Sequence, residues 1–174
     1  GMFRAAVIAV LLIATGCHIY GTGLLGVRFR SIRVGTDGDA FLADSRALYV
    51  IKALEELGRR TRPDQTLLVL PEGVMINYLS RRVNPTPYFV FLPVELALFG
   101  EHQMLSSMQA HPADYVMLVH RETSEYGVRF FGRDYGRKLY AWIVAHYRPI
   151  TQIGAPPLQD NRFGILLLRR HGID

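Results

Sequence analysis

Cysteine and lysine are scarce in this 174-residue sequence, which has one cysteine, Cys17, and two lysines, Lys52 and Lys138. A single cysteine excludes an internal disulfide framework and any zinc site built from several cysteines. His102 and His111 lack the i, i+4 spacing of two metal ligands on one helix. We therefore expect no metal site.

Because lysine is scarce, almost all of the net charge of +5 comes from arginine. A basic chain can bind nucleic acid, anionic lipid or phosphate. The arginines are scattered, however, and most stand beside acids or at expected helix ends, which is typical of ordinary surface charge. We expect no nucleic-acid partner. The 49% hydrophobic and 20% charged fractions are typical of a folded domain rather than a disordered chain.

The motifs of several enzyme classes are also missing. No G-x-G-x-x-G or Walker-type loop follows an expected strand, so a nucleotide site would lack its usual phosphate cradle. Ser124 has no G-x-S-x-G context, which argues against a hydrolase triad. Asp37 and Asp39 resemble the start of a calcium loop, but Leu48 occupies the position of the final acidic ligand. We assign no cofactor and no catalytic residue from these patterns.

The longest apolar run lies near the N-terminus, where AAVIAVLLIA follows Arg4. From Ala5 to Val27 the sequence has no formal charge apart from a possible one on His18. A helix of about 20 mostly apolar residues crosses a bilayer. We predict a transmembrane helix or membrane anchor over residues 1–27, in contact with membrane lipid, and an α/β domain in water over residues 28–174.

Two alternatives remain for this segment. Ala14-Thr15-Gly16-Cys17 resembles the cleavage site of a bacterial lipoprotein signal, which would make the protein a membrane-anchored lipoprotein that binds a small ligand or a protein partner. A short apolar run can also be a buried core helix.

The arginines at 28, 30 and 33 outnumber Arg4, which favours a cytoplasmic position for the C-terminal side.

Strand and helix patterns alternate through the rest of the chain. Strands are expected at residues 29–34, 66–70, 88–92, 114–120, 150–153 and 163–168. Helices are expected at residues 44–58, 74–80, 94–110 with an interruption near Gly100, and 135–147. This alternation predicts a layered, mostly parallel sheet flanked by helices. The short connection GAPPLQDNR predicts that the last two strands form a C-terminal antiparallel β-hairpin.

The first candidate site follows the apolar strand TLLVL. Ligands of open α/β sheets gather beyond the carboxyl ends of strands, so Glu72, Asn77 and Tyr78 are candidates to line a crevice there. The alternative is structural: Glu72 would be a favourable acid in the first helical turn, and Asn77 a local hydrogen-bonding residue.

The second candidate site is the loop of residues 120–136, which begins as another strand ends. Arginine forks and aromatic platforms suit a phosphate or sugar ligand, and His120 titrates in the range of proton transfer. A small hydrolase using His120 with Glu122 or Asp134 is a further hypothesis. In the structural alternative the glycines make turns and the charges pair with one another. The binding candidates in this loop are His120, Arg121, Glu122, Tyr126, Arg133, Asp134 and Tyr135.

The runs LPEGVMINYLSRRVNPTPYFVFLP, DYVMLVHRETSEYGVRFFGRDYG and WIVAHY resemble the C-terminal part of bacterial multi-spanning glycosyltransferases. These enzymes belong to the dolichyl-phosphate-mannose protein mannosyltransferase-like superfamily. The resemblance covers the chain from near Val34 onward. It rests on general pattern similarity rather than on an invariant catalytic signature.

The resemblance implies that Ala5 to Val27 is the last membrane helix of such an enzyme in the bacterial inner membrane. The domain that follows would face the periplasm. The partners would be a polyprenyl-phosphate sugar carrier and a glycan or protein acceptor. The catalytic acids of these enzymes lie in an early loop that this sequence does not contain, so the expected role is support of acceptor or carrier binding without catalysis.

Overall fold

The computed structural model describes residues 1–172, except for the side chains of residues 24, 25, 27 and 37. The chain is an α/β protein that forms two compact units, Gly1–Leu48 and Tyr49–Asp174. The predicted division at residue 27 concerns the membrane boundary and stays a prediction.

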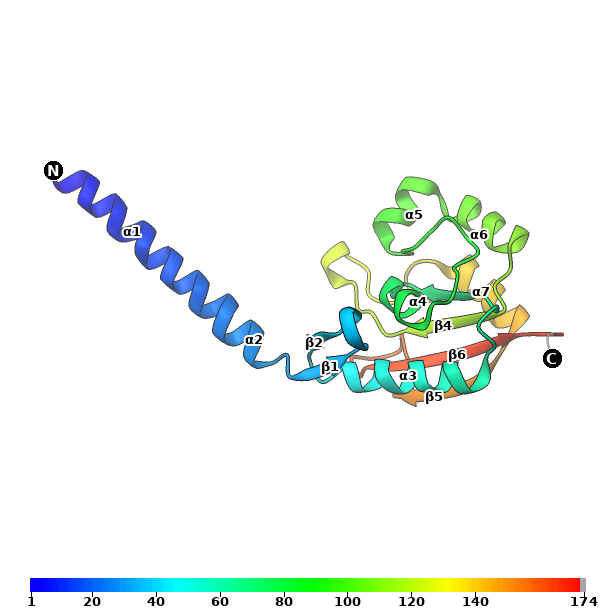
Figure 1. Cartoon of the computed structure of the whole chain (residues 1–174). Coiled ribbons are helices and arrows are strands. Elements are labelled where there is room, and N and C mark those ends of the chain that lie inside the picture. The colour runs from blue at the N-terminus through cyan, green and yellow to red at the C-terminus, as the bar shows by residue number, and fades with distance from the viewer. Residues whose placement is uncertain (173–174) are drawn as a thin grey trace. The chain divides into compact units, whose positions relative to one another are not determined.

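The first unit begins with a long helix (Figure 1). It comprises α1 (Met2–Ile19), a π-helical turn (Tyr20–Leu25) and α2 (Gly26–Arg28). The segment Met2–Gly23 is long and apolar enough to cross a membrane, and none of it is buried within the protein. A core helix would bury its apolar side chains, so this exposure argues against the interpretation as a core helix. It is consistent with a membrane segment.

A short antiparallel hairpin completes the first unit. It pairs β1 (Ile32–Val34) with β2 (Phe41–Ala43) around a 3-10 turn (Asp37–Asp39). The strand expected over residues 29–34 is present only in its second half. Strand β2 was not among the expected elements, because three residues are too few to show an alternating pattern.

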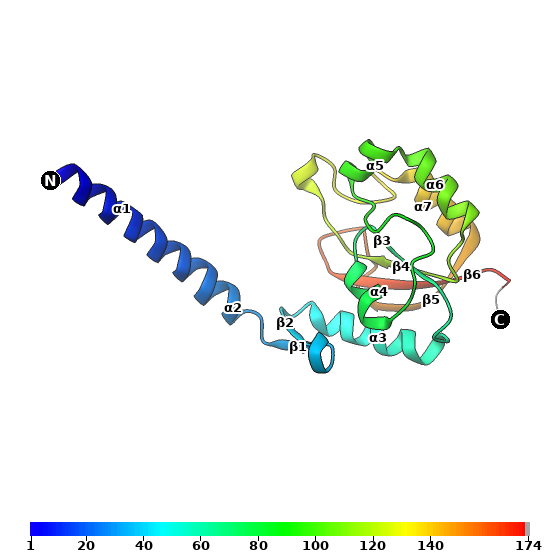
Figure 2. The same ribbon diagram turned by 45° about the horizontal axis from the view of Figure 1, so that its top comes forward.

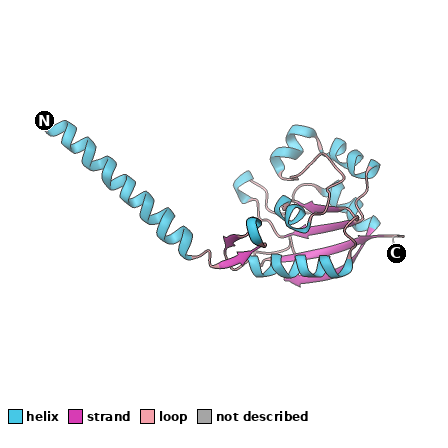
Figure 3. Cartoon of the chain, viewed as in Figure 1, coloured by secondary structure: helices cyan, strands magenta, loops and turns pink. Residues whose placement is uncertain are grey.

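The second unit is built on a four-stranded sheet with the order β3-β4-β6-β5 (Figures 1 and 3). Its strands are β3 (Leu67–Leu70), β4 (Tyr115–Val119), β5 (Tyr147–Gly154) and β6 (Gly164–Arg170). The sheet is not mostly parallel as expected, because only β3 and β4 are parallel, whereas β4–β6 and β5–β6 are antiparallel. The antiparallel pairs arise because β5 and β6 form the expected C-terminal hairpin and β6 inserts beside β4.

Helices cover both faces of this sheet (Figure 2). Helices α3 (Ala47–Arg60) and α4 (Val74–Ser80) bury Ala53, Leu57 and Ile76 in one core cluster. Helices α6 (Glu101–Ala110) and α7 (Arg137–His146) bury Met104, Leu139 and other apolar residues in the second cluster. Strands β3 and β4 are buried along their whole length, as their unbroken apolar sequence predicts.

The single helix expected over residues 94–110 is divided into α5 (Pro93–Phe99) and α6 at the expected position. Gly100 separates them with φ +82°, a left-handed value that favours glycine. The prediction of a break near this glycine is therefore confirmed.

The prediction of a strand over residues 88–92 was wrong. In this range only Val90 pairs with another segment, through an isolated bridge to Glu72. The cause is local. The carbonyl of Tyr88 accepts hydrogen bonds from Asn84 Nδ2 at 2.7 Å and Thr86 Oγ1 at 3.2 Å. Local hydrogen bonds of this kind compete with strand pairing. Tyr88 and Phe91 are instead buried in one of the core clusters.

Candidate functional site

The carboxyl ends of β3 and β4 lie at the same edge of the sheet, because the two strands are parallel with Leu70 beside Leu118. A cis Leu70–Pro71 bond leads to Glu72 after β3, and His120 and Arg121 follow β4. Arg121 Nε donates to Glu72 Oε2 at 3.1 Å. The two candidate sites are therefore joined at one edge, the usual place for ligands in α/β sheets.

The loop between β5 and β6 reaches the same edge. Strand β6 is antiparallel to β4, so its first residue, Gly164, lies beside the end of β4. The amide of His120 donates to the carbonyl of Gly164 at 2.9 Å. This pairing brings residues 155–163 next to loop 120–136.

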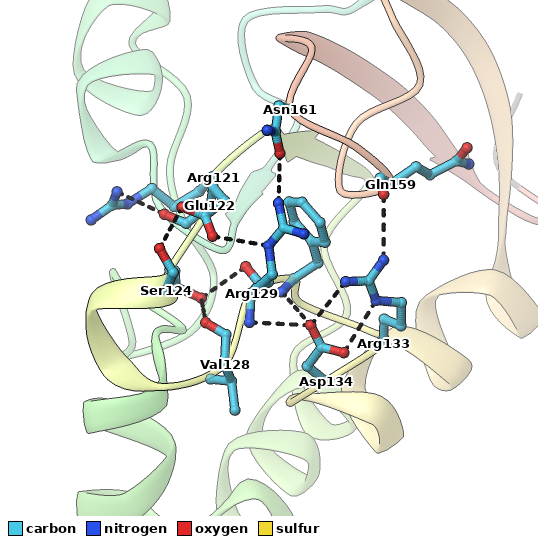
Figure 4. Close-up of polar contacts among 11 residues, drawn as sticks. Arg121, Glu122, Ser124, Val128, Arg129, Arg133, Asp134, Gln159 and Asn161 are labelled. Atoms are coloured by element: carbon cyan, nitrogen blue, oxygen red, sulfur yellow. Dashed lines mark hydrogen bonds and ion pairs between the residues drawn. The ribbon is translucent and has the colours of Figure 1, made fainter.

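A cavity of about 440 Å³ lies between these two loops, and we call it the sheet-edge cavity. Figure 4 shows how most of its polar side chains lie. Arg129 donates from Nε to Glu122 Oε1 at 3.2 Å and from Nη2 to Asn161 Oδ1 at 2.6 Å. Ser124 Oγ donates to Glu122 Oε2 at 2.8 Å. The lining residues are His120, Glu122, Ser124, Arg129 and Asn161.

His120 has a defined tautomer when it is neutral. Its Nδ1 accepts a hydrogen bond from the amide of Leu158 at 3.3 Å, so the proton lies on Nε2. The ring packs between Phe130 and Phe163, with centroid distances of 5.7 and 6.1 Å. Burial lowers the pKa of His120 below 6.5, although Asp160 and Glu122 act in the opposite direction. His120 is therefore a neutral hydrogen-bond donor near pH 7.

The charges that line the sheet-edge cavity cancel. A hydrogen bond from Ser124, followed by one from Arg129, lowers the pKa of Glu122, which keeps its carboxylate ionised. The negative charge of Glu122 is matched by the positive charge of Arg129, while His120, Ser124 and Asn161 are uncharged. A phosphate would meet an arginine that already has a carboxylate partner. A neutral ligand rich in hydroxyl groups fits this set of donors and acceptors better.

Asp134 holds the far side of loop 120–136 in place. Its Oδ2 accepts the amides of Phe130 at 3.0 Å and Arg129 at 3.1 Å. Its Oδ1 accepts a hydrogen bond from Arg133 Nε at 3.1 Å. Hydrogen bonds from Arg133 and from these amides lower the pKa of Asp134 to about 2. Asp134 thus organises the backbone that carries Arg129 and does not itself line the sheet-edge cavity.

Arg133 and the tyrosines of the loop lie away from the sheet-edge cavity. The guanidinium of Arg133 lies 4.6 Å from the centroid of the Phe130 ring and borders a separate cavity of about 240 Å³. Tyr135 packs against Phe131, and burial raises its pKa to about 12. Tyr126 is exposed at the end of a 3-10 turn.

Asn77 and Tyr78 do not line the crevice in which they were expected. Asn77 Nδ2 donates to the carbonyl of Leu67 at 2.8 Å and that of Arg82 at 3.1 Å, so it lies at the start of β3. The edge that carries Glu72 is at the other end of that strand. The guanidinium of Arg81 lies 4.4 Å from the Tyr78 ring centroid. The direction of α4 explains this placement. The helix begins after the carboxyl end of β3 and runs back along the strand, so Asn77 reaches the start of β3.

Three lining residues were not among the candidates. Ser124 and Arg129 lie inside the predicted loop, but the sequence offers no reason to select them over its other polar residues. Asn161 lies in the hairpin connection GAPPLQDNR. Its position follows from the insertion of β6 beside β4, which local sequence patterns do not encode.

Within residues 1–172, no three histidine, cysteine, aspartate or glutamate side chains come together in a way that could hold a metal ion. Comparison with protein-family models, with functionally described proteins and with solved structures finds no match for this chain. The case for a function therefore rests on the residues of the chain itself.

Proposed function

We propose that this chain is a non-catalytic, membrane-anchored domain of a bacterial glycosyltransferase that uses a polyprenyl-phosphate-linked sugar. In this proposal the sheet-edge cavity binds a neutral sugar unit of the acceptor or of the carrier. The observation that carries it is the charge-balanced, hydroxyl-compatible lining of that cavity: a neutral His120, a paired Glu122 and Arg129, and Asn161.

Three further features support the proposal. The apolar helix Met2–Gly23 is suited to a membrane, where polyprenyl carriers reside. The cavity lies beyond the carboxyl ends of β3 and β4, where α/β sheets bind ligands. The sequence runs quoted above resemble the C-terminal part of membrane glycosyltransferases.

The ligand is tested on the full chain in detergent micelles. Titration calorimetry with mannobiose, and separately with inorganic phosphate, distinguishes a neutral sugar from an anion. We expect saturable binding of the sugar and no binding of phosphate at the same concentration. Binding of phosphate alone would contradict the charge argument.

The absence of catalysis is tested by incubating the same chain with radiolabelled polyprenyl-phosphomannose and an oligosaccharide acceptor. We expect no transfer of the label. Transfer by this chain alone would overturn the proposed division between a binding domain and a catalytic region elsewhere.

The orientation is tested with reporter fusions at the C-terminus. A periplasmic domain gives an active alkaline phosphatase fusion and a dark fluorescent-protein fusion. The three arginines after the helix favour the opposite result, so this experiment decides between the resemblance and the charge pattern.

A lipoprotein remains the second candidate, favoured by Ala14-Thr15-Gly16-Cys17. Mass spectrometry of the chain purified from membranes separates the two. A diacylglyceryl group on Cys17 at a new N-terminus fits only a lipoprotein, whereas an intact segment before Cys17 fits the membrane helix.

A further inference from the structure

A second cavity, of about 310 Å³, lies at the other end of the same sheet, and we call it the Trp142 cavity. It lies where α7 ends, beside Pro112 just before β4 and Arg170 at the end of β6. The sheet-edge cavity follows the carboxyl end of β4, so the two cavities lie at opposite ends of that strand. The lining residues are Gln109, Pro112, Trp142, His146, Arg170 and His171.

The central feature of the Trp142 cavity is a pair of stacked rings. Trp142 and His146 lie one turn apart on α7, with centroids 4.9 Å apart and planes inclined by 27°. Tyr147 supports the indole edge-on at 5.6 Å, and its hydroxyl donates to the carbonyl of Ala113 at 2.8 Å. The indole is therefore held in one orientation by groups on two elements. Trp142 is partly exposed, so the stacked pair offers a fixed apolar surface to a ring-shaped ligand.

The polar groups around the rings are arranged for hydroxyl groups. His146 Nδ1 lies 2.8 Å from the carbonyl of Trp142, which can only accept, so Nδ1 carries the proton. In the neutral ring Nε2 is then an acceptor. Arg170 makes long hydrogen bonds to Asp114 Oδ1 at 3.3 Å and to the carbonyl of Pro112 at 3.4 Å. Its guanidinium therefore has donor capacity left.

An anion is a poor occupant of the Trp142 cavity. The charge of Arg170 is already balanced by Asp114. The C-terminal end of α7 also directs its carbonyl groups toward this region, and the partial negative charge of a helix C-terminus disfavours anions. The volume matches one or two rings of a small ligand and not a protein segment.

We propose that the Trp142 cavity binds a pyranose ring of a neutral glycan. The ring packs against the stacked Trp142–His146 pair, and its hydroxyls donate to His146 Nε2 and accept from Arg170 and Gln109. This second sugar subsite lies outside the proposed function, which concerns the opposite end of the sheet. It depends on that proposal only for the choice of glycans as probes.

Trp142 is the single tryptophan of the chain, so its fluorescence reports occupancy of this cavity directly. The full chain in detergent is titrated with hexasaccharides of mannose, of glucose and of N-acetylglucosamine, up to about 10 mM. We expect at least one of them to produce a saturable change in indole emission. No saturable change with any of the three would overturn the proposal.

Two variants locate the signal. His146→Ala removes the acceptor and the stacked ring, and is expected to weaken binding about tenfold or more. His146→Gln keeps a polar group and is expected to bind with intermediate affinity, while circular dichroism checks that both variants are folded. The control is His102→Ala, an exposed histidine of α6 that does not line the cavity. Wild-type affinity in His146→Ala would overturn the proposal.

Asn161→Ala separates this inference from the proposed function, because it alters only the sheet-edge cavity. Retention of the indole response in this variant is expected. If Asn161→Ala abolishes that response, the emission change originates at the sheet-edge cavity, and the second subsite is rejected while the proposed function stands.

Discussion

The Nη2 atom of Arg129 donates a 2.6 Å hydrogen bond to Oδ1 of Asn161, which lies 32 residues further along the chain. The contact joins the loop after β4 to the loop before β6. It orients the guanidinium toward Glu122 and leaves the amide nitrogen of Asn161 available to a ligand (Figure 4). Both loops line the sheet-edge cavity, and this contact holds them together.

Asn161→Ala is therefore expected to weaken sugar binding at the sheet-edge cavity about tenfold, the effect of losing one hydrogen bond to a ligand and one to Arg129. Titration calorimetry with mannobiose measures it. Gln159→Ala is the matched control, because this exposed residue is in the same loop and does not line the cavity. Equal losses in both variants would mean that the loop as a whole, and not Asn161, determines affinity.

A second prediction concerns the protonation of His120. Burial lowers the pKa of His120 below its ordinary value of 6.5, so the unfolded chain binds the proton more readily. The contribution of neutral His120 to the free energy of unfolding is complete above pH 6.5. It is lost as the pH falls through the pKa that His120 has in the folded state. Thermal unfolding between about pH 7 and pH 5 checks this, and His120→Gln should show a shallower decline than the wild type.

Protonation of His120 also acts on the ligand, because it adds a positive charge to a cavity whose charges otherwise cancel. Sugar affinity should fall over the same acidic range in the wild type and stay nearly constant in His120→Gln. If both proteins show the same pH profile, His120 does not control the affinity. Asp160 and Glu122, its charged neighbours, stay ionised over this range because their pKa values are lowered.

A third prediction concerns the start of the parallel pair. Asp114 Oδ2 accepts from Thr66 N at 2.9 Å and from Thr66 Oγ1 at 3.0 Å, and Thr66 Oγ1 accepts the amide of Asp114 at 2.9 Å. Asp114→Ala leaves these donors without their partner and should lower the free energy of unfolding by about 1–3 kcal/mol. Denaturant titration followed by Trp142 emission measures the loss.

Asp64→Ala is the control for this effect. Asp64 forms an exposed ion pair with Arg62 at 3.3 Å, and pairs of this kind contribute about 0.5 kcal/mol or less. A comparable loss in both variants would indicate a general charge effect and not the brace between Asp114 and Thr66.

The elements with a strong local pattern were predictable from sequence. Helix α4 has the predicted bounds, and the buried strands β3 and β4 were recognised from unbroken apolar runs. Strand β5 is longer than the predicted residues 150–153. The prediction missed its first half, which contains Pro149, where the register with β6 shifts. A proline at a bulge is compatible with a strand, but it interrupts the sequence pattern.

The candidate site was predictable only in part, for a physical reason. His120 and Glu122 follow a recognisable strand, so the sequence places them at the end of β4. The partner that completes the cavity, Asn161, is brought there by the pairing of β6 with β4, and strand order is a property of the whole fold. Asn77 was misplaced because its polarity serves the backbone of Leu67 and not a ligand.

A fourth prediction compares a closely packed glycine of the C-terminal hairpin, Gly164, with an unhindered glycine of α3, Gly58. A Cβ atom on Gly164 would overlap with the carbonyl oxygen of Ala155, and backbone atoms cannot move aside cheaply. Gly164→Ala should therefore destabilise the protein by about 3 kcal/mol or more. Gly58→Ala meets no atom within 4 Å near the end of α3 and should raise stability by about 0.5–1 kcal/mol. Denaturant titration of both variants checks the difference in sign.

The last prediction concerns the anchor, on which the proposed function depends. Leu12 lies near the middle of Met2–Gly23 and is exposed, as expected for a side chain that faces lipid. An arginine at the centre of a membrane helix costs about 3 kcal/mol of insertion free energy, whereas alanine costs far less. Leu12→Arg should therefore move the full chain from the carbonate-resistant membrane fraction toward the supernatant, and Leu12→Ala should not. If the wild type itself dissolves without detergent, the helix serves another purpose. The polyprenyl-linked sugar would then lose its physical route to the sheet-edge cavity, while binding of a soluble glycan there would be unaffected.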